Sequence, residues 1–81
     1  MVRVVIEGWT AGLNKVQLNV LLRTRAGYGL AQAKDAVDRL LGGHVVSFEI
    51  SDLALADAFC VSARAVGAVC SVHPHALSGT H

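Results

Sequence analysis

Hydrophobic and polar residues alternate at the start of the chain and then change to a helical spacing. In the stretch VRVVIEG, residues 2–8, every second position is apolar, which is the pattern of a strand with one buried face. Asn14 stands three residues before Gln17, a spacing typical of a helix start because the Asn14 side chain can accept a bond from a free backbone N–H. The pattern therefore predicts a strand over residues 2–8 and a helix from Asn14 to about Ala26.

The same reasoning predicts two more helices and two more strands. Glycines interrupt the first helical pattern, and a second helical stripe of apolar residues begins at Leu30 and ends before Gly42. The β-branched and aromatic segment HVVSFEI favours a second strand, and AVCSV a third. Between them, Ser51 is expected to cap a third helix that ends at Gly67.

The order of these elements is β-α-α-β-α-β. A right-handed crossover through the third helix would make the last two strands parallel, with the first strand between them and antiparallel to both. We therefore expect an α+β two-layer sandwich with three helices on one face of a three-stranded sheet. The expected core residues, which share the periodicity of their elements, are Val4, Ile6, Leu18, Leu22, Leu30, Val37, Leu41, Phe48, Phe59 and Val66.

Length and composition place the chain in one class of protein. Its 81 residues suit a single domain, expected over residues 1–73 and followed by a flexible tail over residues 74–81. The chain is 53% hydrophobic, yet no apolar run approaches the roughly 18 residues that cross a bilayer. The start lacks the charged head, apolar middle and cleavage site of a secretory signal, and two cysteines make a poor disulfide framework. We expect a cytoplasmic protein with reduced thiols.

The net charge of +1 is unevenly distributed along the chain. Residues 14–42 hold five basic and two acidic side chains, whereas the rest holds two basic and four acidic ones. Such a dipolar molecule steers an acidic partner toward one end. The basic footprint is too sparse for a nucleic-acid-binding protein, so we expect no nucleic-acid partner.

Candidate sites of chemistry are incomplete. Gly27 and Gly29 precede a helix but lack a phosphate-binding motif, so a helix-to-helix turn is the preferred interpretation. The pair His73 and His75 lacks the further ligands of a metal site. Cys60 lies on one helical face with Asp57 and Arg64, a setting in which some thiols are reactive, but an inert thiol is the preferred interpretation. The sequence thus predicts no enzyme, no cofactor and no metal.

A surface is more informative than these residues. On the first helix, Val16 and Val20 project nearly opposite the core leucines, beside Asn19 and Arg23. A small apolar patch with a basic rim suits a protein-docking site as well as it suits ordinary exposure. The third helix is apolar nearly all round, and the open sheet face would display Val5 with two further valines, Val45 and Val69. We therefore also expect self-association, as a two-fold dimer.

One stretch resembles a known family. The segment LNKVQLNVLLRTRAGYGLAQAKDAVD is similar to the helical hairpin of the C-terminal domain of the bacterial ribosomal stalk protein, the acidic multi-copy L-seven/L-twelve type. The matching positions are Asn14, Lys15, Val16, Arg23, Gly27, Gly29, Leu30, Ala33, Lys34, Asp35 and Val37. The resemblance extends more weakly over residues 2–72 and covers that domain alone, without the family's N-terminal dimerisation segment and hinge.

The resemblance implies a non-catalytic domain of translation that recruits translational GTPases through its first helix and the start of its second. The partner-binding residues that it implies are Lys15, Val16, Asn19, Val20, Arg23, Gly29, Leu30 and Lys34. Two alternatives remain: an adaptor that delivers substrates to a Clp-type protease, which shares this general fold, and a small enzyme or metal protein that uses Cys60 or the His73 and His75 pair.

Overall fold

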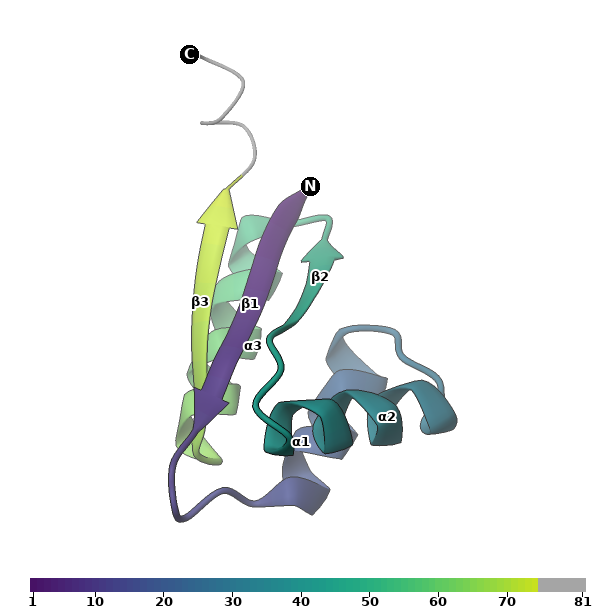
Figure 1. Cartoon of the computed structure of the whole chain (residues 1–81). Coiled ribbons are helices and arrows are strands. Elements are labelled where there is room, and N and C mark those ends of the chain that lie inside the picture. Colours follow the sequence, from purple (N-terminus) through teal and green to yellow (C-terminus); the bar gives the residue numbers. More distant parts are fainter. Residues whose placement is uncertain (75–81) are drawn as a thin grey trace.

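The computed structural model describes residues 1–74, which form three strands and three helices in the expected order (Figure 1). The elements are β1 (Val2–Trp9), α1 (Lys15–Arg25), α2 (Leu30–Leu41), β2 (Val46–Ile50), α3 (Leu53–Ala65) and β3 (Ala68–Pro74). Strand β3 therefore includes Pro74, which was expected to lie outside the domain. The rest of the expected tail, residues 75–81, lies outside the described residues.

The sheet has the predicted topology. Its strand order is β2-β1-β3, and β1 is antiparallel to both neighbours. Along β1, Val2, Val4 and Ile6 are buried while Arg3 and Glu7 are exposed, as the alternation predicted. The helices pack on the buried side, with α3 behind the sheet in Figure 1 and the α1–α2 hairpin extending past β2. The fold is thus the expected α+β sandwich.

Most of the predicted core residues lie in the core. Six of them are buried: Val4, Ile6, Leu18, Leu22, Val37 and Phe59. Three others, Leu41, Phe48 and Val66, are half-buried and pack against that core. The prediction for Leu30 is wrong, because its side chain is 67% exposed. Leu30 is the first residue of α2, and the buried stripe of this helix begins one turn later, at Ala33.

Two helix starts show how local chemistry sets the boundaries. The Asn14 side chain accepts a hydrogen bond from the Gln17 backbone N–H at 3.1 Å, which confirms the predicted cap of α1. At α3 the cap is Asp52 and not Ser51, because the Asp52 carboxylate accepts a bond from the Ala54 N–H at 3.0 Å. A carboxylate at this end also interacts favourably with the helix dipole.

The apolar residues of helix α3 are not all on its buried face. Its buried residues are Ala56, Phe59, Cys60 and Ala63. Leu55, one turn before Phe59, is 54% exposed. When a helix is apolar nearly all round, its sequence does not show which face is buried. Packing against the sheet then decides the buried face.

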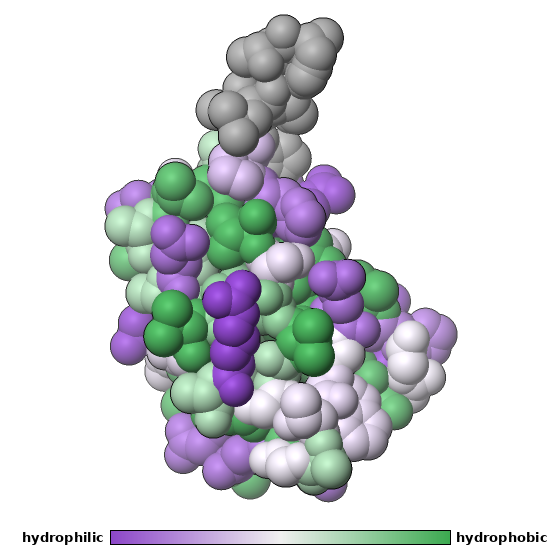
Figure 2. Space-filling view, turned by 90° about the vertical axis from the view of Figure 1, so that its left-hand side faces the viewer, coloured by the Kyte–Doolittle hydropathy of each residue, from purple (hydrophilic) through white to green (hydrophobic). Residues whose placement is uncertain are grey.

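The open face of the sheet is mainly polar. Of its predicted valines, Val5 is half-buried, and Val45 and Val69 are exposed. Their polar neighbours include an ion pair between Arg3 and Glu49 at 3.7 Å. Figure 2, which views the β3 side of the molecule, shows green apolar groups separated by purple polar ones. Self-association through this face remains a prediction, with less apolar surface than the sequence suggested.

Two buried thiols join α3 to β3. Cys60 is 2% exposed and Cys70 is 4% exposed, and both belong to the core. Burial raises the pKa of the Cys70 thiol well above its usual value near 9.0, and the neighbouring Cys60 thiol raises it further. Cys70 therefore stays protonated in the folded chain under conditions where an exposed thiol ionises.

This pKa difference predicts a loss of stability in mild alkali. The unfolded thiol ionises above pH 9 while the folded one does not, so the contribution of Cys70 is full below pH 9 and declines above it. The free energy of unfolding should fall by about 1.4 kcal/mol per pH unit from this group. Urea unfolding at pH 7.5, 9 and 10, under reducing conditions, should show a shallower decline for Cys70→Ala. Equal declines for both proteins would contradict the assignment.

Candidate protein-binding surface

The turn between α1 and α2 sets the two helices side by side. Gly27 has a φ of 75°, a left-handed conformation that glycine adopts without strain. The backbone N–H groups of Ala26 and Tyr28 both donate to the carbonyl of Leu22, at 3.2 and 3.0 Å, and close the end of α1. The Gln32 side chain then accepts a bond from the Gly29 N–H at 3.2 Å and starts α2. The glycine pair thus forms the predicted turn.

A groove of about 250 Å³ runs between the two helices. Its residues recur at helical spacing, so one face of each helix contributes a wall. The groove is lined by Lys15, Val16, Asn19 and Arg23 from α1 and by Lys34, Val37 and Asp38 from α2. We call these seven residues the hairpin groove.

The hairpin groove combines apolar surface with positive charge. Val16 is 71% exposed on one wall, and the buried Val37 lies at the base. The Arg23 Nε donates to Asn19 Oδ1 at 2.8 Å, which fixes the guanidinium along α1. Lys34 Nζ lies 3.1 Å from Asp38 Oδ2, an exposed pair. With three basic side chains and one acidic one, the groove suits an acidic partner that also offers an apolar side chain.

The structure brings together five of the eight residues predicted to bind a partner. Lys15, Val16, Asn19, Arg23 and Lys34 all line the hairpin groove. This result follows from the packing of α1 on α2, since the residues lie on two helices.

The other three predicted residues lie outside the lining. Leu30 is exposed one turn before Lys34 on the same side of α2, so it extends this surface toward the turn. Gly29 supplies the backbone cap of α2. Val20 was expected to face water and is instead half-buried. Val16 is therefore the better exposed of the two valines.

Sequence reasoning missed two residues of the groove. Val37 was predicted only as core, and Asp38 was not considered. The spacing of Lys34 and Asp38, four apart on one helix, is a signal that could have placed Asp38 beside the site. No pattern in the sequence shows that a buried valine also forms the base of a groove.

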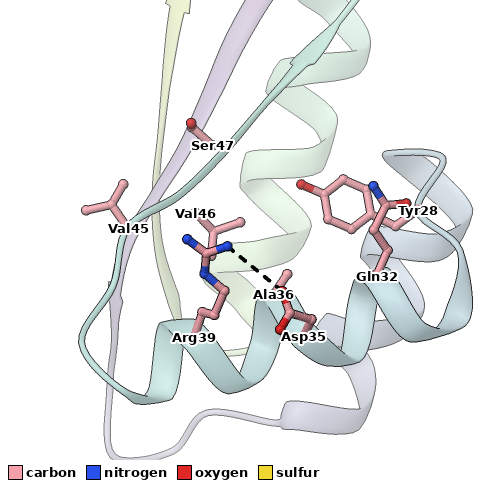
Figure 3. Close-up of a pocket in the computed structure, with 8 residues that line it drawn as sticks. All are labelled: Tyr28, Gln32, Asp35, Ala36, Arg39, Val45, Val46 and Ser47. Carbon is pink, nitrogen blue, oxygen red and sulfur yellow. Dashed lines mark ion pairs between the residues drawn. The ribbon is translucent and has the colours of Figure 1, made fainter.

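A second hollow, of about 330 Å³, lies on the opposite side of α2, against β2 (Figure 3). It is more polar than the hairpin groove, and hydroxyl, amide, carboxylate and guanidinium groups converge on it. The lining residues are Tyr28, Gln32, Asp35, Ala36, Arg39, Val45, Val46 and Ser47. We call this hollow the β2 groove.

Packing places the polar groups of the β2 groove. The Tyr28 ring meets Phe48 edge-on at 5.6 Å, and Figure 3 shows its hydroxyl turned into the hollow. Burial raises the pKa of Tyr28, while the positive charge of Arg39 opposes this shift, so the guanidinium lies within electrostatic reach of the phenol. Arg39 Nη1 is 3.9 Å from Asp35 Oδ2. This long pair leaves other guanidinium N–H groups to bind a ligand.

The described residues of the enzyme or metal-protein alternative are not assembled into a site. Within residues 1–74, no three His, Cys, Asp or Glu side chains are grouped closely enough to hold a metal ion. His73 is exposed on β3, and His75 lies outside the described residues. Cys60 is buried, and Arg64 donates to the Cys70 carbonyl instead.

No helix of the described part is long and apolar enough to span a membrane.

Comparison of the chain with known protein families and with curated proteins finds no match.

Proposed function

We propose that this chain is a non-catalytic protein-binding domain that docks an acidic partner in the hairpin groove. Its resemblance to the C-terminal domain of the ribosomal stalk protein suggests the partner class, a bacterial translational GTPase. In this proposal Val16 receives an apolar side chain of the partner, and Lys15 and Arg23 interact with its carboxylates. The domain would act in the cytoplasm, where such GTPases work.

One observation carries the proposal. Residues that the resemblance assigned to partner binding, spread from Lys15 to Lys34 along the chain, line one groove. They include Val16, an apolar side chain that is 71% exposed, and three basic groups that line the same groove. Docking sites commonly combine such apolar surface with complementary charge at the rim.

The proposal predicts that Val16→Asp will weaken binding strongly and leave the fold intact. The new carboxylate would repel an acidic partner and replace its apolar contact. Because Val16 is exposed, the free energy of unfolding should change by no more than about 0.5 to 1 kcal/mol. The probe is a purified bacterial elongation-factor GTPase loaded with a non-hydrolysable GTP analogue, with binding measured by calorimetry.

The control is Val61→Asp on α3, where a valine of similar exposure, 64%, lies outside the groove. We expect Val16→Asp to weaken binding at least tenfold and Val61→Asp to change it less than twofold. Equal losses of affinity in the two variants would show that the partner does not dock at Val16. If the wild type does not bind the GTPase, the proposed partner class is wrong.

A further inference from the structure

The two outer strands of the sheet present different edges. On β3, Arg64 from α3 donates two hydrogen bonds to the Cys70 carbonyl, at 3.1 Å from Nε and 2.8 Å from Nη2. This carbonyl therefore points away from β1, toward the outer edge. Pro74, which has no N–H to donate, follows on the same strand and pairs with Val2. A guanidinium and a proline are both devices that keep an edge strand from pairing with another chain.

The Arg64 contact also fixes the direction of the backbone groups across the sheet. In an antiparallel pair, opposed residues alternate between bonded and non-bonded positions. Cys70 is opposite Ile6 and points away from it, so the backbone groups of Ile6 point toward β2, where Val46 is its partner. Ser47 is the next residue and is opposite Val5. The N–H and C=O of Ser47 are therefore turned toward the outer edge of β2.

This edge of β2 opens into the β2 groove. Ser47 lines the groove on the strand side, and Gln32, Asp35 and Arg39 line it from α2 at intervals of three and four residues. Figure 3 shows Gln32 and Arg39 reaching from α2 into the space between α2 and β2, while the Ser47 side chain points away from it. An outward-facing backbone position beside a helix face is the arrangement by which some domains add an extended peptide to a sheet.

We propose that the β2 groove binds an extended acidic peptide segment, which pairs with Ser47 as a fourth strand and places a carboxylate on Arg39. The Tyr28 hydroxyl and the Gln32 amide can donate further bonds to the peptide. The volume of about 330 Å³ is near the lower end of ligand sites, about 300 to 1,000 Å³, so the groove takes a short segment.

Arg39 identifies the occupant as acidic. It is the basic side chain among the residues that line the groove, and Asp35 is the acidic one. Arg39 Nη1 is 3.9 Å from Asp35 Oδ2, a long contact that a shorter bidentate bond to a peptide carboxylate can replace. The site is separate from the hairpin groove, on the other side of α2, and does not depend on the function proposed there.

A single strand fits this edge better than a second copy of the sheet. In Figure 1 the α1–α2 hairpin extends past β2, so a second sheet that approached in the plane of the first would meet the helices. An extended peptide needs only the width of one strand, about 5 Å.

The test is selection of peptides from a displayed library of random heptapeptides on the full chain and on Ser47→Pro. Proline removes the outward N–H and is tolerated where a strand N–H faces away from the sheet, so Ser47→Pro should fold. We expect enrichment of heptapeptides with an Asp or Glu at one fixed position on the wild type, and none on Ser47→Pro. The best peptide is then synthesised with and without backbone N-methyl groups, which block strand pairing. This comparison uses the wild-type protein and therefore tests strand pairing even if Ser47→Pro fails to fold.

Two results together would support the proposal. N-methylation should weaken binding of the selected peptide at least tenfold. Arg39→Gln should weaken binding of the same peptide about five- to tenfold. It should not change the affinity of a control peptide in which Gln replaces the selected Asp or Glu. Absence of enrichment, or binding that ignores N-methylation, would overturn the proposal. Sedimentation of the wild type that shows a dimer lost in Ser47→Pro would also overturn it, because the edge would then belong to a second copy.

Discussion

Leu22→Ala is expected to destabilise the protein by about 2 to 5 kcal/mol, because it removes buried methyl groups and leaves a cavity in the core. Leu22 is 1% exposed on α1, and its carbonyl receives the two N–H bonds that close the turn before α2. A domain of this size is stable by only about 4 to 12 kcal/mol, so much of the stability would be lost. Urea unfolding followed by circular dichroism measures the loss.

The matched control is Leu55→Ala on α3, where the same chemical change falls on a side chain that is 54% exposed. It should cost less than about 1 kcal/mol. Comparable losses for the two variants would show that the burial of α1 or of α3 is wrongly assigned, and with it the face that α1 turns toward the hairpin groove.

Gly67→Ala is expected to cost roughly 2 to 5 kcal/mol, through backbone strain and overlap together. Gly67 has a φ of 101°, and a Cβ there would lie 2.7 Å from the Cα of Leu13. The same glycine accepts bonds on its carbonyl from the N–H and hydroxyl of Thr10, at 2.8 and 3.2 Å. The close approach fixes the loop that leads into α1. We expect a lower melting temperature in a thermal unfolding experiment.

Gly43→Ala separates strain from overlap. Gly43 has a similar φ of 92°, but a Cβ there would meet nothing within 4 Å. Its substitution should therefore cost only the conformational part, about 1 to 2 kcal/mol. If both alanine variants melt at the same temperature, the contact between Gly67 and Leu13 does not contribute to stability.

The sequence predicted the parts of the fold that depend on local patterns. Alternation in β1 identified Val4 and Ile6 as buried, and the side chain of Asn14 identified the start of α1, because both signals act within a few residues. The order of the elements then limited the sheet to the observed topology.

The errors arise where position depends on packing between distant elements. Leu55 and Ala56 are both apolar, and only contact with the sheet decides that Ala56 is buried. Leu30 fits the spacing of a core stripe but precedes the buried residues of α2, which begin at Ala33. Leu30 and Leu55 are both apolar, and that character is compatible with either side of a helix.

The candidate site was predictable only in part for the same reason. One wall of the hairpin groove, from Lys15 to Arg23, follows from the helical spacing of α1. The base at Val37 requires the packing of α2 on α1. The β2 groove was not predicted at all, because the outward direction of Ser47 depends on the hydrogen bonds of all three strands.

The most direct test of the docking proposal is to map amide chemical shifts of the isotope-labelled chain during titration with the GTP-analogue-bound GTPase. We predict that the largest changes fall on residues of both walls, including Val16, Asn19 and Lys34, with little change at Val61 on α3. Changes confined to α3 or to the open face of the sheet would contradict the central claim that this chain binds its partner in the hairpin groove.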